Sequence, residues 1–184
     1  MRKITLSLLA GSIALAFTGS ALAENPMVGG AAMYADKNIV ENAVNSKDHT
    51  TLVAAVKAAG LVETLSGEGP FTVFAPVNAA FEKLPAGTVE TLLKPENKDT
   101  LTKVLTCHVV AVDAMSDAIG KMISDDGGNH PVKTVGGCML QAKMDGEKIT
   151  LTDENGNVAT VTIADVDQSN GVIHVIDTVL LPKS

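Results

Sequence analysis

Histidine side chains stand in two apolar stretches of this sequence, where they could do chemistry. His108 and His174 each lie in a run that is typical of a strand, so each polar ring must find a partner. Such a histidine could serve as a base, a metal ligand or a pH switch. The simpler interpretation is a buried ring that donates to a backbone carbonyl and locks two elements together. Asp177 and Asn78 are candidate partners for such a network.

Cys107 and Cys138 are the only cysteines. Because the N-terminal residues have the features of an export signal, we expect this even pair to form a disulfide in an oxidising compartment. Closing a loop of roughly 30 residues stabilises by about 3 to 4 kcal/mol in the chain-entropy model. The alternative is an enzyme or redox protein built on Cys107, His108 and Cys138, which requires an exposed thiol of low pKa. The spacing fits neither a C-x-x-C redox motif nor a zinc ribbon.

Other chemical signatures are absent from the sequence. It has no G-x-S-x-G nucleophile motif, no Walker motif and no glycine-rich phosphate loop. The segment 153–157 (DENGN) superficially resembles a calcium loop, but it lacks the EF-hand order and is better interpreted as a hairpin turn. His49 and His130 are expected to be solvated, since they fall at a helix start and in a loop. We therefore expect no catalytic residue, no cofactor and no metal site.

Residues 1–23 are predicted to be a secretory signal peptide. Arg2 and Lys3 precede a mainly apolar stretch, and Ala21-Leu22-Ala23 has the A-x-A pattern of a cleavage site. The apolar stretch is shorter than the roughly 20 residues that span a bilayer, and we expect no transmembrane segment after cleavage. The protein is therefore expected in the periplasm or outside the cell.

Charge argues against nucleic acid as a partner. The formal net charge is −7, and it becomes −9 when Arg2 and Lys3 leave with the signal. An acidic chain without a basic stripe repels phosphate rather than releasing counterions from it. Residues 24–36 contain the pair Gly29-Gly30 and are expected to be flexible, and residues 37–184 are expected to form a single domain.

The stretch 69–85 (GPFTVFAPVNAAFEKLP) is the centre of the predicted fold. Its first half alternates as a strand with at least one buried face does, and Pro76 ends that strand. Asn78 is predicted to cap a helix over 79–84, because its side-chain oxygen can accept an N–H two or three residues on. The chain thus changes here from strand to helix.

Helical spacing dominates the sequence before about residue 123 and strand patterns dominate after it. Helices are predicted over 37–45, 52–59, 61–65, 88–93, 96–105 and 113–123. Gly60 is expected to end the second of them. Strands are predicted over 107–112, 132–135, 139–143, 149–152, 158–166 and 172–181. This segregation indicates an α+β fold with antiparallel sheets.

Three motifs closely resemble those of the fasciclin domain family. The stretch 69–85 is similar to its first signature, 170–182 (NGVIHVIDTVLLP) to its second, and 105–110 (LTCHVV) to its tyrosine-histidine motif. They occur in the family's order and roughly its spacing, and the similarity extends from about Asn38 to Pro182. The resemblance implies a β-wedge of two antiparallel sheets with several short helices packed on one side.

Two departures from the family pattern stand out. The usual Thr-Asp is Val77-Asn78 here, and the motif tyrosine is replaced by Cys107 beside a retained His108. In animal members this motif is among those implicated in receptor recognition, so that role does not carry over simply. A disulfide from Cys107 to Cys138 is a simpler account of the change, because it replaces aromatic packing with a covalent link.

The resemblance and the signal peptide together lead to a functional expectation. We expect an exported, non-catalytic fasciclin domain protein that acts as an adhesion or protein–protein interaction module, as a monomer or weak oligomer. Its partner would be an unidentified protein or a component of the cell surface or matrix. The alternative is a periplasmic protein that binds a small molecule or carbohydrate in a cleft beside the helices. The structural or interaction candidates of the family motifs are Asn78, His108, His174 and Asp177.

Overall fold

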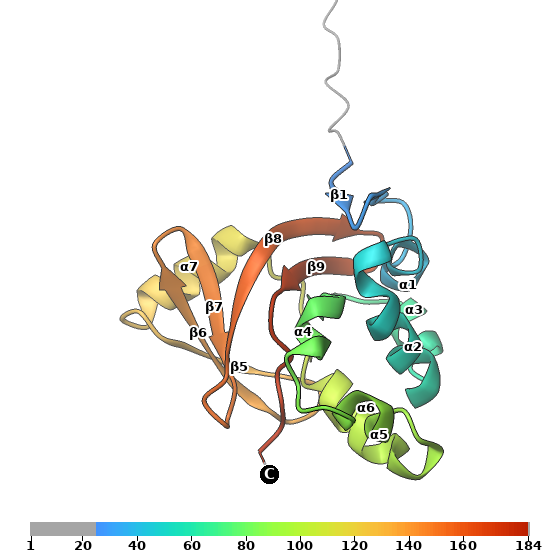
Figure 1. The fold of residues 1–184 in the computed structure, drawn as a ribbon. Coiled ribbons are helices and arrows are strands. Elements are labelled where there is room, and N and C mark those ends of the chain that lie inside the picture. The colour runs from blue at the N-terminus through green and yellow to red at the C-terminus, as the bar shows by residue number, and fades with distance from the viewer. Residues whose placement is uncertain (1–24, 184) are drawn as a thin grey trace, which may run out of the picture.

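The computed structural model describes residues 25–183 (Figure 1). The predicted signal peptide lies outside them. The helices are α1 (Ile39–Ala43), α2 (Thr50–Ala59), α3 (Val62–Ser66), α4 (Asn78–Glu82), α5 (Thr88–Leu92), α6 (Lys98–Thr106) and α7 (Ser116–Asp125), with short 3-10 turns at Lys47–His49 and Pro95–Asn97. The strands are β1 (Met27–Val28), β2 (Ala31–Ala32), β3 (Phe71–Pro76), β4 (Val109–Val110), β5 (His130–Lys133), β6 (Met139–Asp145), β7 (Lys148–Thr152), β8 (Val158–Gln168) and β9 (Gly171–Ile176). No helix within 25–183 has the length and apolar character needed to cross a membrane.

Seven of these strands form one continuous hydrogen-bonded order, β4-β3-β9-β8-β7-β6-β5. The α+β class is confirmed. The sheet is continuous rather than divided in two, and β3 pairs with β9 in parallel, whereas the other neighbours are antiparallel. This parallel pair joins the two signature motifs, because Phe71 lies opposite Gly171 and Pro76 lies opposite Ile176.

A bend in β8 curves the seven-stranded sheet toward a barrel, and Figure 1 shows β8 as a long curved strand. Its register against β9 shifts between Val161 and Val166, and Asp165 within this irregularity has a positive φ of 57°. Such bulges increase the local bend and twist of a strand. The two end strands therefore approach each other, and Val135 N–H donates to Val109 C=O across 2.8 Å.

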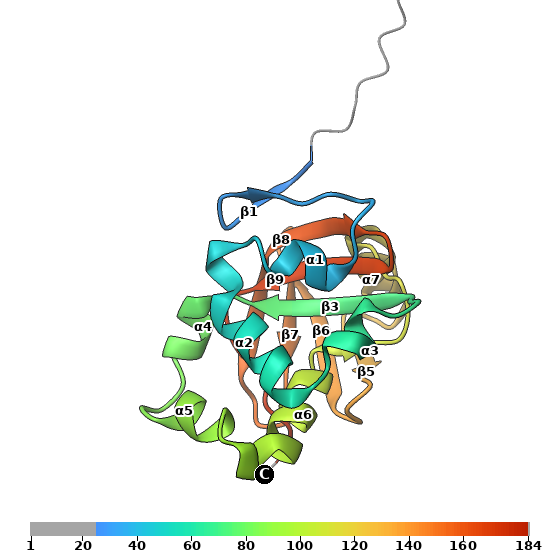
Figure 2. The ribbon, with the colours of Figure 1, turned by 90° about the vertical axis from the view of Figure 1, so that its right-hand side faces the viewer.

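Strands β3 and β9 form a wall between two hydrophobic cores. Val73 and Val175 face the core that α1, α2 and α6 cover, whereas Phe74 and Ile176 face the core enclosed by β6, β7 and α7. Figure 1 places α1, α2 and α3 on one side of the molecule and α7 on the opposite side, and Figure 2 looks onto the side that carries the three helices. Because both faces of β9 are covered, every one of its residues is buried.

The local structure differs from the sequence expectations at two places and agrees with them at a third. The segment 24–36 contains the β1–β2 hairpin rather than being flexible throughout, because Val28 and Met33 are buried in the helix-covered core. The strand expected over 107–112 is reduced to Val109–Val110, since α6 continues to Thr106. Helix α2 ends as expected, with Gly60 at a φ of 74°.

Candidate functional site

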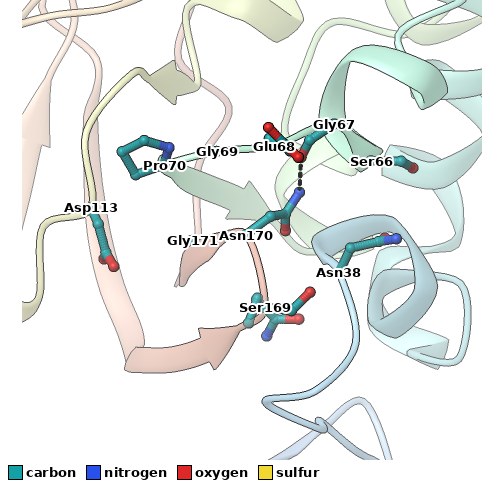
Figure 3. Close-up of a pocket in the computed structure, with 11 residues that line it drawn as sticks. Asn38, Ser66, Gly67, Glu68, Gly69, Pro70, Asp113, Ser169, Asn170 and Gly171 are labelled. Atoms are coloured by element: carbon teal, nitrogen blue, oxygen red, sulfur yellow. Dashed lines mark hydrogen bonds between the residues drawn. The ribbon is translucent and has the colours of Figure 1, made fainter.

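The two signature motifs meet at an open groove beside the start of β3 (Figure 3). Its volume is about 480 Å³. The groove is lined by the end of α3, the turn that leads into β3 and the β8–β9 turn, with Asn38 and Asp113 at its sides. The lining residues are Asn38, Ser66, Gly67, Glu68, Gly69, Pro70, Asp113, Gln168, Ser169, Asn170 and Gly171. Residues of both signature motifs line this groove.

Asn170 holds this corner together. Its Nδ2 donates to the carbonyls of Leu65 and Gly67, at 2.8 and 2.9 Å, and its Oδ1 accepts the N–H of Ile39 at 3.0 Å. These are groups at the C-terminal end of α3 and at the start of α1, where a helix lacks internal partners. Figure 3 shows the bond to Gly67. The side chain is therefore committed to the fold, whereas an Asn-Gly pair by itself is typical only of a turn.

Glycine at 69 and 171 is required by close backbone approach. A Cβ on Gly69 would lie 2.0 Å from the carbonyl oxygen of Asn170, and one on Gly171 would lie 1.9 Å from that of Phe71. No side chain fits at either distance, and Gly171 also has a φ of 151°. The motif glycines thus allow β3 and β9 to pair at their first residues.

The polar side chains of the groove suit hydrogen bonding. Glu68 and Asp113 contribute its carboxylates, and Ser66 and Ser169 contribute hydroxyls. The lining contains no histidine, cysteine, lysine or arginine. Over residues 25–183, no group of histidine, cysteine and acidic side chains has an arrangement able to hold a metal ion. The groove can therefore accept hydrogen bonds from a polar ligand.

His108 connects α6 to the C-terminal segment. Its Nδ1 lies 2.8 Å from the carbonyl of Val104, and its Nε2 accepts the N–H of Leu180 at 2.9 Å. Burial lowers the pKa of His108 to about 4, against weaker opposing effects of the Val104 carbonyl and Asp153. The ring is therefore neutral, with a donor on Nδ1 and an acceptor on Nε2.

His174 makes an equivalent connection on β9. Its Nε2 lies 2.8 Å from the carbonyl of Ala114, and its Nδ1 accepts the N–H of Asp165 at 3.2 Å. The ring is fully buried and stacks on Phe74 with centroids 5.8 Å apart. Burial is the main cause that lowers the pKa of His174. Both rings bond the backbone on both sides, which matches the simpler interpretation of locking elements together.

Asn78 and Asp177 do not join these histidines. Asn78 is the first residue of α4, not its cap, and its Oδ1 accepts the N–H of Thr51 at 3.0 Å, in the first turn of α2. Asp177 Oδ1 accepts the N–H of Thr160 at 2.9 Å, and its Oδ2 lies 3.9 Å from Lys83 Nζ. The expected cap of α4 is thus corrected: Asn78 caps a neighbouring helix instead, because the turn after β3 brings α4 beside α2.

The two cysteines form a disulfide between the end of α6 and the turn after β5. Cys107 is 1% exposed and Cys138 is 2% exposed, and their Cα atoms are 5.4 Å apart. Two backbone bonds accompany the link, from Val135 to Val109 and from Gly136 to Thr106. The geometry provides no exposed thiol, which a redox or thiol enzyme requires.

His49 was expected to be solvated and is instead buried, with 3% exposure. Its Nδ1 lies 2.8 Å from Ser46 Oγ, while its Nε2 has no hydrogen-bond partner within the described chain. Burial lowers the pKa of His49. His130 is partly buried and lies 2.6 Å from Asp126, so it is not simply solvated either. The position of His49 at a helix start did not indicate its burial, because Val28, Met33 and Ser46, which lie around the ring, come together only in the folded chain.

Asp153 and Asp165 are structural residues that sequence reasoning missed. Asp153 Oδ1 accepts the N–H groups of Asn155 and Asn157, each at 2.9 Å, which fixes the expected hairpin turn. The Asp-x-Asn pattern was the available signal for this turn. Asp165 Oδ1 accepts the N–H of Ser116 at 2.6 Å, at the start of α7, and only the folded chain brings these residues together.

Comparison with known proteins agrees with this architecture. The model of the fasciclin domain matches residues 47–182. Protein sll1483 of Synechocystis is 51% identical over 159 residues, which cover 86% of this chain and 81% of the relative. Transforming growth factor-beta-induced protein ig-h3 of Sus scrofa is 38% identical over 133 residues, which cover 72% of this chain and 17% of the relative.

A solved structure supports the fold independently. The FAS1 domain pair of the insect cell adhesion molecule fasciclin I aligns with a TM-score of 0.56 and 24% identity, covering 71% of this chain and 43% of that one. Its likeness concerns the fold alone. Together with the match over residues 47–182, these findings show that the chain belongs to the fasciclin domain family.

Proposed function

We propose that this protein is an exported, non-catalytic fasciclin domain that acts as an adhesion or protein–protein interaction module in the periplasm or outside the cell. The observation that carries the proposal is membership of a family whose fold is shared with an insect cell adhesion molecule. The expected partner is a protein or a component of the cell surface or matrix. Residues 37–184 would form its single domain.

The internal use of the motif side chains supports a role without catalysis. His108 and His174 bond the backbone through both ring nitrogens, and Asn170 uses its side chain at two helix ends. A general base must have a ring nitrogen free to reach its substrate. These groups support the fold, which leaves the outer surface for recognition.

Surface attachment of a deletion strain tests export and adhesion together. The gene is deleted in its source organism and attachment to a solid surface is measured, with complementation by the full chain or by a chain lacking residues 2–23. Restoration by the full chain alone is the expected result. Attachment that is unchanged by the deletion, together with no partner crosslinked from envelope extracts, would remove the basis for adhesion.

A second candidate function is binding of a small polar molecule or carbohydrate. The observation that favours it is the open groove of about 480 Å³ beside α3, whose lining includes Ser66, Glu68, Asp113 and Ser169. A ligand that binds only the folded protein raises its melting temperature. A thermal-shift screen of sugars therefore tests this function, with Glu68→Gln as the variant that weakens any response and Glu63→Gln, on the exposed face of α3, as its control.

A further inference from the structure

The sheet does not close into a complete barrel, because its two end strands, β4 and β5, do not pair with each other. A second cavity lies between these two strands. The two end strands are joined near the disulfide by the Val135–Val109 and Gly136–Thr106 backbone bonds. Farther from the disulfide, the space between them is a cavity of about 220 Å³ that α7 and β7 also border. Figure 1 shows α7 and β5 on the side of the molecule away from α1 and α2.

The wall of this cavity is almost entirely apolar. Its apolar side chains include Phe74, Val110, Val112, Ile119, Met122 and Leu151. The hydroxyl of Thr72 is already used, since it donates to Val112 C=O at 2.7 Å and accepts the N–H of Ala114 at 2.9 Å. Val112 is 49% exposed, so the apolar surface continues to the solvent. Burial of such surface by an apolar ligand is favourable, at about 25 cal/mol per Å².

Size restricts the ligand to a short chain. A volume of 220 Å³ is below the roughly 300 to 1,000 Å³ of pockets that hold drug-sized ligands. It equals the space of about seven water molecules at roughly 30 Å³ each, enough for a similar number of methylene groups. A chain of about eight carbons therefore matches the cavity.

A cation of β5 stands among the lining residues. Lys133 is exposed, and it is not a member of any ion pair among residues 25–183. The carboxylate of Asp126 is held by His130 at 2.6 Å. In a chain of net charge −7, an uncompensated ammonium beside an apolar cavity favours an anionic head group.

We propose that the cavity between β4 and β5 binds a free medium-chain carboxylate, with the apolar tail between Val110, Val132 and Phe74 and the carboxylate at Lys133. This site is separate from the groove at Asn170 and does not depend on adhesion. Failure of the attachment experiment would therefore leave it unaffected.

Titration of the ¹⁵N-labelled protein with sodium octanoate tests the proposal. Saturable chemical-shift changes confined to the lining backbone, such as that of Val110 and Val132, are expected. Acetate, which has the head group without the tail, should cause no such changes. Absence of saturable shifts, or shifts distributed away from the cavity, would overturn the proposal. Because the titration uses the wild-type protein, this test does not depend on whether a variant folds.

Two pairs of variants assign the tail and the head group. Val132→Phe fills the cavity and should weaken octanoate binding at least tenfold, whereas Val158→Phe, at an exposed position of β8, should leave it unchanged. Lys133→Gln should weaken octanoate about two- to fivefold, as for an exposed ion pair, and leave octanol unchanged. Lys143→Gln, an exposed lysine of β6, is its control. Equal binding by wild type and a folded Val132→Phe protein would also overturn the proposal.

Discussion

His108 accepts the backbone N–H of Leu180 through Nε2 at 2.9 Å, although 72 residues separate the two. The other nitrogen of the ring faces Val104 C=O at 2.8 Å. A neutral imidazole satisfies both bonds, whereas an imidazolium would place a second N–H against that of Leu180. The C-terminal segment is therefore held to α6 by a ring that must remain neutral.

This arrangement predicts a loss of stability in acid. The pKa of His108 falls from 6.5 to about 4 on folding because the ring is buried. The unfolded chain thus binds a proton first, and the stabilisation is complete above pH 6.5 and is lost as the pH falls toward 4. Urea unfolding should show a decrease of roughly 3 kcal/mol from His108 alone by pH 4.

The variant His108→Gln isolates this contribution. Its free energy of unfolding should fall less steeply between pH 6.5 and 4 than that of the wild type. Burial also lowers the pKa of His49 and His174, so part of the acid dependence should remain. An identical pH profile for wild type and variant would contradict the role given to His108.

The disulfide predicts a second effect on stability. Its loop spans a sequence separation of 31 residues, for which the chain-entropy model gives about 3 to 4 kcal/mol. The double variant Cys107→Ala/Cys138→Ala should lose this amount in urea unfolding. Dithiothreitol should lower the wild type to a similar value and leave the double variant unchanged. A variant as stable as the oxidised protein would show that the link contributes nothing.

Asn170 and Asn155 each donate to two backbone carbonyls, so substitutions at the two positions can be compared. Asn170→Ala leaves the carbonyls of Leu65 and Gly67 and the N–H of Ile39 without this partner, and should cost about 1 to 3 kcal/mol. Asn170→Asp should cost more, because it turns a carboxylate oxygen toward those carbonyls. The control is Asn155→Ala.

Asn155 also donates to two carbonyls, those of Leu181 and Pro182, but it is exposed. Water can replace its bonds, so Asn155→Ala should cost less than about 1 kcal/mol. Chemical denaturation measures all three variants. Equal effects at positions 155 and 170 would contradict the assignment of Asn170 as the support of this corner.

Local patterns predicted those parts of the fold that depend on neighbouring residues. The alternation of Phe71 to Ala75, the strands after residue 130 and the stop of α2 at Gly60 all reflect contacts within a few positions. The parallel pairing of β3 with β9 was not predicted, because it joins segments about 100 residues apart and no turn determines it. The sequence therefore predicted which segments are strands better than it predicted the order in which those strands pair.

In the candidate site, too, local features could be predicted from the sequence and long-range contacts could not. An Asn-Gly pair such as 170–171 is typical of a turn, which is local, but the bond from Asn170 to Leu65 crosses a sequence separation of 105 residues. His49 was expected in solvent because it lies at a predicted helix start, whereas its ring is buried by tertiary contacts. Polar side chains that act across the fold leave no periodic signal in the sequence.

Asn78 gives the last prediction, which concerns a cap supplied from another element. Its Oδ1 accepts the N–H of Thr51 at 3.0 Å in the first turn of α2, and its Nδ2 donates to Lys47 C=O at 2.9 Å. Asn78→Ala should therefore cost about 1 kcal/mol, the usual effect of removing a helix cap. Asn78→Asp retains the acceptor and places negative charge at a helix N-terminus, but it turns its other carboxylate oxygen toward Lys47 C=O, so it should recover only part of that loss. Hydrogen exchange locates the effect: amides of α2 should exchange faster in Asn78→Ala, while those of α4, which begins at Asn78 without a side-chain cap, should change less. Faster exchange in α4 alone would instead indicate that Asn78 caps α4, as the sequence predicts.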